Sequence, residues 1–309
     1  MASSVLGQRL VACLLNVSEA RRKELVELVA MAAVYNSKGE QREGVTVLNI
    51  FNDKDYNRSV ITIVAGLDSV RECVLSACEA ACGLIDMQAH TGAHPCMGAV
   101  DLIPIYPLGE AVHMDDCAEH AQAVAQGLTE RVQGSSAFLF GWADRPRQRG
   151  LAQRRREMGW FSRTPDMHAI RADVGPPPQS RYGLTGVGAS SYVMNCNVTI
   201  DTRDLALGRR IAAAIRESAP GGVPGVQPPP RKLEAWPSFS IGGETYCHAP
   251  ASLITARVGE LAGLQGVKVR GTALVGYTPA QCRSLAERAL SLGIGEFWKE
   301  QRRGGLLRM

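Results

Sequence analysis

The sequence has almost no net charge outside one short segment. Its 309 residues carry 34 Lys and Arg against 30 Asp and Glu, a formal net charge of +4. Residues 144–157 (DRPRQRGLAQRRRE) hold six arginines against Asp144 and Glu157, so this segment accounts for the whole net charge. A protein that coats nucleic acid spreads its basic residues over a face or a domain. The composition therefore argues against a generally basic protein and leaves the arginine segment to be explained.

Long apolar runs and paired cysteines are also missing. No run approaches the roughly 18 residues that a membrane-spanning helix needs. The apolar stretch 10–15 is shorter than the core of a signal peptide and leads directly into a polar segment. The nine cysteines are an odd number without paired spacing, which suits a reducing compartment. We therefore expect a cytoplasmic protein that does not interact with membranes.

Three of these cysteines, Cys73, Cys78 and Cys82, lie within one expected helix. Only Cys78 and Cys82 share a helix face, and buried cysteine behaves as a small apolar residue. Helix packing is therefore favoured over a metal site at these positions.

Short apolar runs alternate with amphipathic segments, which is typical of an α/β or α+β layered fold. The chain length favours two domains. The periodicity predicts strands at 10–15, 45–51, 59–65, 99–106 and 137–140, and helices at 18–35, 68–84 and 115–132. This order is βαββαβ with an added αβ, a split-βαβ, ferredoxin-like arrangement.

A shift in composition marks the domain boundary. Residues 173–188 (DVGPPPQSRYGLTGVG) are rich in Gly, Pro and Ser, which predicts a linker or binding loop between domains at 1–172 and 189–309. The second domain is smaller and again mixes sheet and helix. Its predicted strands are at 191–200, near 239 and at 268–275, and its predicted helices are at 204–218, 252–262 and 279–292.

The strongest functional signal is HTGAHPCMGAVD at residues 90–101. Gly and Pro between His90 and His94 predict a loop before a strand, so the two imidazoles need not face the same way. A neutral imidazole is suited to general base catalysis near pH 7, while most histidines are surface or packed groups. A zinc site with Cys96 is disfavoured, because such a loop gives no fixed ligand geometry and no fourth ligand stands out.

This segment resembles the HTGEHPRMGALD signature of the glutamate formimidoyltransferase domain, best known as the N-terminal part of the bifunctional formimidoyltransferase-cyclodeaminase. Further segments agree in order and spacing. They are LLNVSEA at 14–20, YNRSV at 56–60, LIDM at 84–87, DVGP at 173–176 and LVGYTP at 274–279. The similarity extends over about residues 8–295 and weakens after Asp204.

The resemblance implies two ferredoxin-like subdomains whose facing sheets form a ligand groove. It further implies transfer of a formimidoyl group from formiminoglutamate to N5 of tetrahydrofolate, as in histidine catabolism and one-carbon metabolism, with no metal. The family's general base is the second histidine of the pair, here His94. Substrate and folate contacts are then expected from Asn16, Asn57, Arg58, His90, Met97, Gly98, Asp101, Asp173, Gly175 and Gly188.

Several departures from the family pattern support a second hypothesis. Ala93 and Cys96 replace the family's Glu and Arg, Asn49 and Phe51 align with its aspartates, and Ser190 replaces an Arg. Arginines that pair with carboxylates are lost, which should weaken substrate binding or change the substrate. The alternative to an active transferase is therefore a catalytically impaired folate- or anion-binding paralogue with a regulatory or scaffold role.

The arginine segment has three interpretations. Arg149, Leu151 and Arg155 approximate an R..L..IR pattern of the family, which suggests either a positive flank for glutamate-tailed ligands or a solvated helix face. RNA binding is the third, and it is disfavoured because the basic run is not paired with aromatic residues, apart from Trp160 and Phe161 just after it. Small anionic molecules are thus the expected partners, and homodimer formation is left open.

Overall fold

The structure, a computed structural model, describes residues 5–93, 95–159, 171–227, 239–246 and 250–303. Its contacts divide the chain into two units. The first comprises Met1–Ser190 together with Gln281–Arg308, and the second comprises Ser191–Ala280. Each unit has its own sheet and its own core.

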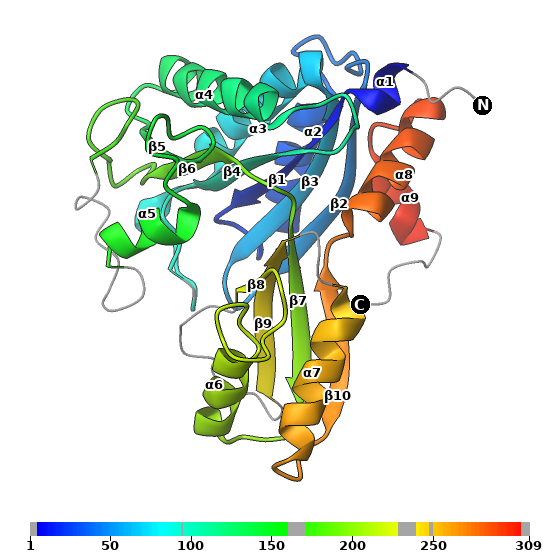
Figure 1. Ribbon diagram of the computed structural model, residues 1–309. Helices are drawn as coiled ribbons and strands as arrows, with labels where there is room; N and C mark the ends of the chain where they lie inside the picture. Colours follow the sequence, from blue (N-terminus) through cyan, green and yellow to red (C-terminus); the bar gives the residue numbers. More distant parts are fainter. Residues whose placement is uncertain (1–4, 94, 160–170, 228–238, 247–249, 304–309) are drawn as a thin grey trace. The chain divides into compact units, whose positions relative to one another are not determined.

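The first unit carries most of the secondary structure (Figure 1). Its elements are α1 (Val5–Gln8), β1 (Leu10–Val17), α2 (Lys23–Val34), β2 (Val45–Asp53), β3 (Arg58–Gly66), α3 (Leu67–Leu84), η1 (Met87–Ala89), β4 (Val100–Pro107), α4 (Met114–Arg131), β5 (Ala137–Gly141), α5 (Leu151–Glu157), β6 (Thr185–Ala189), most of α8 (Pro279–Ser291), and α9 (Phe297–Arg303).

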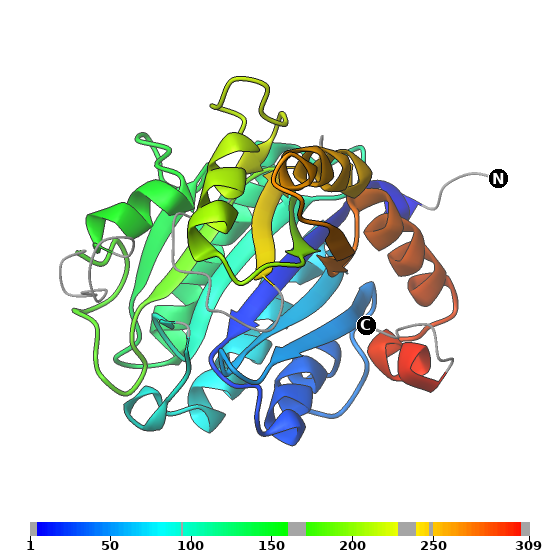
Figure 2. The same ribbon diagram turned by 90° about the horizontal axis from the view of Figure 1, so that it is seen from below.

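The six strands follow the order β2-β3-β1-β4-β6-β5 across the sheet, which Figure 2 shows from below. β1 lies between β3 and β4 and is antiparallel to both, whereas β6 is parallel to β4 and β5. The first four strands with α2 and α3 have the predicted ferredoxin-like topology. The ends of β1 and β2 therefore meet the starts of β3 and β4 at one edge of the sheet.

Helices α2, α3 and α4 cover one face of this sheet (Figure 1). Apolar residues recur every three or four positions along α3, and they therefore form one buried stripe on the helix. Its members are Val70, Cys73, Val74, Ala77, Cys78 and Ala81. The three cysteines of α3 thus lie in or beside the core, and burial raises the pKa of both the Cys73 and the Cys82 thiols to about 12.

The edge of β2 is covered by a segment from far along the chain. The Val47 amide donates to the Gly295 carbonyl at 2.8 Å, and the Thr46 hydroxyl donates to the Ile294 carbonyl at 2.9 Å. Trp298 of α9 is 2% exposed and belongs to the same core as α2 and β2. An exposed edge strand would offer unpaired backbone groups to other chains. The return of the chain after the second unit covers this part of the edge.

The second unit repeats the same topology on a smaller scale. Its elements are β7 (Val193–Ile200), α6 (Leu205–Ala214), β8 (Val226–Gln227), β9 (Phe239–Tyr246), α7 (Ala251–Gly263) and β10 (Val269–Val275). The strand order is β10-β7-β9-β8 and every pairing is antiparallel. Apolar residues of α6 and α7 pack with those of β7 in a separate core. The α+β layered fold class is confirmed.

Two local predictions were wrong. The helix expected from residue 18 begins at Lys23, because the Ser18 hydroxyl donates to the Gly98 carbonyl and the Glu19 carboxylate accepts from two following backbone amides. Residues 185–188, expected within the linker or binding loop 173–188, belong to β6 (Thr185–Ala189) inside the sheet. Their glycines allow this, since a β-carbon at Gly188 would lie 2.5 Å from the Phe140 carbonyl oxygen. Among the described helices, none is long and apolar enough to cross a membrane.

Replacing Trp298 by Ala should lower the free energy of unfolding by about 3 to 5 kcal/mol, because a large buried side chain leaves a cavity. The matched control is Trp142→Ala, where the side chain is 41% exposed, and the expected cost is about 0.5 kcal/mol or less. Urea unfolding followed by circular dichroism measures both. Equal losses for the two variants would show that the C-terminal segment does not complete the core.

Candidate functional site

The histidine motif forms a loop between α3 and β4 that is tied to the turn between β2 and β3. The Ala93 amide donates to the Asp55 carbonyl at 2.9 Å. Gly92 passes so close to that turn that a β-carbon on it would lie 2.2 Å from the Tyr56 carbonyl oxygen. Only glycine permits such an approach. The glycine of the HTG portion is therefore required by packing.

Asn57 fastens three segments together at this point. Its φ of 50° lies in the left-handed region, which asparagine tolerates better than most residues. Its side-chain oxygen accepts from the Ala20 amide at 2.9 Å, and its side-chain nitrogen donates to the Thr91 carbonyl at 3.2 Å. The end of β1, the start of β3 and the histidine loop are thus joined by one side chain.

A buried ion pair lies beneath the loop. Arg58 Nη2 is 2.9 Å from Asp101 Oδ2 and donates to Asn16 Oδ1 at 2.8 Å. Asp101 is fully buried, and its other oxygen accepts from the Met97 amide at 2.7 Å. The Arg58 side chain is 14% exposed. Arg58, which the sequence suggested as a carboxylate contact, is therefore already neutralised by an internal acid.

His90 is held as a neutral imidazole beside this pair. Its Nδ1 lies 3.1 Å from the Ser18 carbonyl oxygen, which can only accept a hydrogen bond, so Nδ1 carries the proton. Nε2 has no hydrogen-bond partner among the described residues. Burial lowers the pKa of His90, and the Ser18 bond and the charges of Glu19 and Asp101 only partly oppose this. At neutral pH its Nε2 is thus an unprotonated acceptor.

Ser18, Glu19 and Arg21 belong to this site although the sequence did not single them out. Glu19 is 3% exposed and accepts from the Arg22 Nε at 2.7 Å. Burial alone would raise the pKa of Glu19, but the hydrogen bonds and charge of Arg22 outweigh it and lower the pKa. Arg21 donates to the Thr91 hydroxyl at 3.0 Å. The LLNVSEA resemblance was the available signal for the first two residues.

Two of the departures from the family pattern, Ala93 and Cys96, lie in the histidine loop. Cys96 is half-buried, and burial followed by the charge of Asp101 raises the pKa of its thiol to about 11. The position of a family arginine is thus occupied by an uncharged group. Asp53, which lies near the family's aspartates but out of register, accepts from the amides of Asp55 and Tyr56 and so shapes the β2–β3 turn.

The second group of expected site residues lies farther along the sheet. Asp173 accepts from the Leu139 amide at 2.7 Å and from Arg154 Nη2 at 2.8 Å, beside β5. Gly175 has a φ of 86° and packs against Ser135. In the strand order β6 and β5 follow β4, so Asp101 and Asp173 are roughly three strand spacings apart, about 14 Å.

The structure thus separates the expected site residues into two sets. Those gathered around the ion pair are Asn16, Asn57, Arg58, His90, Met97, Gly98 and Asp101, and those along β5 and β6 are Asp173, Gly175 and Gly188. The Met97 side chain is fully buried in an apolar cluster with Phe138 and Leu184, so it packs. His94, the expected general base, lies outside the described residues.

Three of the six arginines of the segment, Arg145, Arg149 and Arg154, form ion pairs within the protein. Arg149 makes two hydrogen bonds to Asp144, at 2.8 and 3.0 Å. Arg154 is 2% exposed, pairs with Asp173 and Glu157, and lies 5.3 Å from the Phe138 ring centroid. The expected solvated helix face is therefore wrong for Arg154. These pairs also leave less charge available for a polyanion.

Within the residues that the structure covers, no three histidine, cysteine or acidic side chains gather as they would around an ion.

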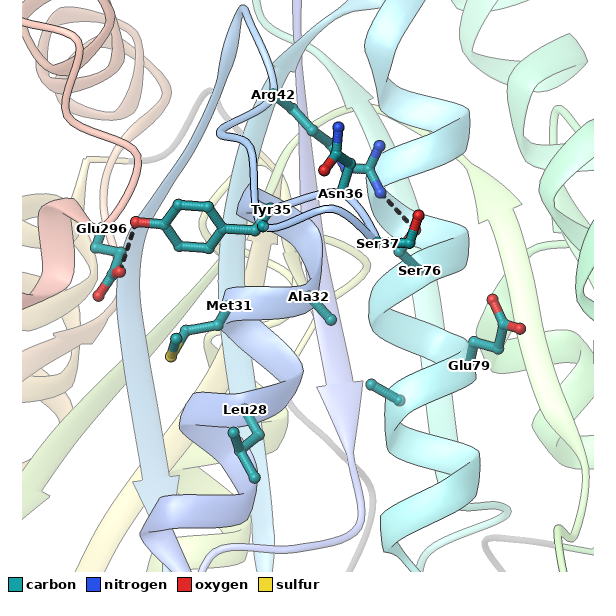
Figure 3. Close-up of a pocket in the computed structure, with 12 residues that line it drawn as sticks. Leu28, Met31, Ala32, Tyr35, Asn36, Ser37, Arg42, Ser76, Glu79 and Glu296 are labelled. Carbon is teal, nitrogen blue, oxygen red and sulfur yellow. Dashed lines mark hydrogen bonds between the residues drawn. The ribbon is translucent and has the colours of Figure 1, made fainter.

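A separate depression of about 800 Å³ lies over α2 and α3 (Figure 3). Arg42 donates to the Ser76 hydroxyl at 2.8 Å within it, and the Tyr35 hydroxyl donates to Glu296 at 2.8 Å. It shares no residue with the histidine loop, so we do not place the chemistry there.

Fold and site define a ferredoxin-like α+β protein with a histidine loop held over a buried arginine–aspartate pair. A family model for the N-terminal subdomain of the formiminotransferase domain matches residues 10–190. The matched range ends one residue before the second unit begins. The chain therefore belongs to the formiminotransferase family.

Curated relatives agree. Glutamate formimidoyltransferase of Thermoplasma acidophilum is 30% identical over 213 residues, which cover 67% of each chain. The protein of that name from Streptococcus pyogenes is 32% identical over 69% of this chain and 70% of its own. Formimidoyltransferase-cyclodeaminase of Sus scrofa is 34% identical over 69% of this chain but only 38% of its own length. A solved microcompartment protein from Desulfitobacterium hafniense aligns at 12% identity over 86% of this chain and 93% of its own with a TM-score of 0.22, which carries no argument.

Breaking the buried pair by Arg58→Met should destabilise the fold by about 3 to 5 kcal/mol, because Asp101 would remain buried without its counter-ion. Arg9→Met is the matched control, since it breaks an exposed pair with Asp68 that is worth about 0 to 1 kcal/mol. Chemical unfolding measures both. A cost for Arg58→Met no larger than the control would contradict a structural role for the pair.

Gly92→Ala should strain the loop against Tyr56 and cost about 1 to 3 kcal/mol. Gly83→Ala is the control, because nothing lies within 4 Å of a β-carbon there and alanine favours the helix by up to about 1 kcal/mol. Thermal unfolding and amide hydrogen exchange of residues 90–93 report the effect. Unchanged exchange in Gly92→Ala would show that the close approach does not hold the loop.

Proposed function

We propose that this protein is a folate-dependent formimidoyltransferase that moves a formimidoyl group from formiminoglutamate to N5 of tetrahydrofolate. One observation carries the proposal: the HTG.HP.MGA.D core is retained, and its described residues are fastened over the Arg58–Asp101 pair. Relatives named glutamate formimidoyltransferase and formimidoyltransferase-cyclodeaminase support the same class of reaction.

In this reaction the N5–carbon bond forms while the bond between the formimidoyl carbon and the glutamate nitrogen breaks. His94 takes the N5 proton as general base, and the departing glutamate nitrogen gains a proton. His90 lies four residues before His94 in the sequence. It is neutral at pH 7, so its Nε2 keeps a hydrogen-bond acceptor within the site. The buried pair and Asn57 hold the loop backbone, which favours a fixed orientation of the two reactants.

The proposal also includes the co-substrate, the donor, the two subdomains and the cellular location. Tetrahydrofolate is the co-substrate, formiminoglutamate the anionic donor, and no metal takes part. The first unit (Met1–Ser190 with Gln281–Arg308) and the second unit (Ser191–Ala280) act as the two subdomains. The protein works in the cytoplasm, without membrane or nucleic-acid partners.

A catalytically impaired folate- or anion-binding paralogue is the second candidate, and Cys96 favours it. The family has an arginine there, and this chain has an uncharged thiol. Ala93 removes an acid from the same loop. Both changes are compatible with the fold, because neither residue belongs to the Arg58–Asp101 pair.

The two candidates are separated by assaying purified protein with formiminoglutamate and tetrahydrofolate for glutamate release. An active transferase should lose at least about a hundredfold in kcat in His94→Ala, the usual contribution of a general base. His120→Asn, a half-buried histidine on α4, should leave the rate unchanged. Zero turnover in wild type and His94→Ala alike would reject the enzyme. Tetrahydrofolate binding by calorimetry would then support the paralogue.

A further inference from the structure

Both proposed substrates carry glutamate carboxylates, which call for a cation at the site. Arg58 does not supply it, since its charge is neutralised by Asp101 and its side chain is largely buried. Cys96 stands where the family has an arginine, and its thiol is uncharged. Another residue has to meet this requirement.

Arg21 has the geometry for it. Its Nη1 donates to the Thr91 hydroxyl of the histidine loop at 3.0 Å, and its Nε donates to the Lys54 carbonyl of the β2–β3 turn at 3.2 Å. The exposed guanidinium therefore spans the two segments that enclose the site, and it is close enough to His90 for its charge to be felt by that imidazole.

The charge of Arg21 is not compensated within the described residues, where it forms no ion pair. Its two side-chain partners are a hydroxyl and a carbonyl, both neutral. The adjacent Arg22 differs, since it pairs with the buried Glu19. Ala93, two residues after Thr91, stands where the family has a glutamate, so this position of the loop adds no acid. These two hydrogen bonds orient the Arg21 guanidinium, and its Nη2 remains available to donate to a ligand oxygen.

We infer that Arg21 is the carboxylate-binding residue of this site and receives a glutamate carboxylate of a substrate. The inference rests on the proposed function for its substrates. The carboxylate belongs either to the formimidoyl donor or to the glutamate tail of the folate, and both present the same chemistry to a guanidinium.

Calorimetry with two stable probes distinguishes these sources. N-formylglutamate represents the donor, and p-aminobenzoylglutamate represents the folate tail. Arg21→Ala should weaken one probe by about tenfold or more, the value of a charge-assisted hydrogen bond. Arg21→Lys should recover part of the affinity, because the ammonium keeps the charge but lacks the planar set of N–H donors of the guanidinium. The probe that responds identifies the carboxylate that Arg21 receives.

The control is Arg9→Ala, an exposed arginine paired with Asp68 beside α3, which should bind both probes as wild type does. Thr91→Val keeps the charge of Arg21 and removes one orienting bond, so an intermediate loss is expected. Equal binding of both probes by Arg21→Ala and wild type would overturn the inference, and so would absence of binding to wild type. These measurements need no turnover. An inactive protein with Arg21-dependent binding would reject the transferase and keep the inference. Turnover together with unchanged binding in Arg21→Ala would support the transferase and reject the inference.

Discussion

The ion pair between Arg58 and Asp101 is the constraint on which the candidate site depends. It connects the first residue of β3 to the second residue of β4 across β1, and Asn16 of β1 shares the same guanidinium nitrogen. A carboxylate as buried as Asp101 is tolerated only with a partner, because the desolvation of an unpaired charge is costly. The pair therefore sets how three strand ends and the Met97 amide are placed relative to one another.

Much of the histidine motif is explained by packing before any chemistry is invoked. Gly92 is required by its approach to Tyr56, and a β-carbon at Gly98 would lie 2.8 Å from the Tyr182 carbonyl oxygen. Met97 fills an apolar cluster. A chain that lost activity would still need these residues in order to fold. Gly92, Met97 and Gly98 thus serve the fold, and the polar residues of the motif and those that face the loop decide the chemistry.

Local patterns predicted the elements well, whereas partners distant in the sequence were not predictable. The strand at 45–51 and the helix at 68–84 were found within two residues of their predicted ends, because burial repeats every two or about 3.6 residues within one segment. The partners of Arg154 were missed. Its contact with Asp173 joins residues nineteen positions apart, and no periodicity reports such a contact.

By itself the sequence determined the layered fold class, the order of the elements from β1 to β5 and the family, since these follow from periodic apolar residues and a specific motif. Only the tertiary structure decided that β6 enters the sheet between β4 and β5, that Arg58 is neutralised and that Arg21 forms no ion pair with the described residues. Whether a charged side chain is available to a ligand depends on which distant groups reach it, and the folding of the chain in three dimensions alone brings those groups together.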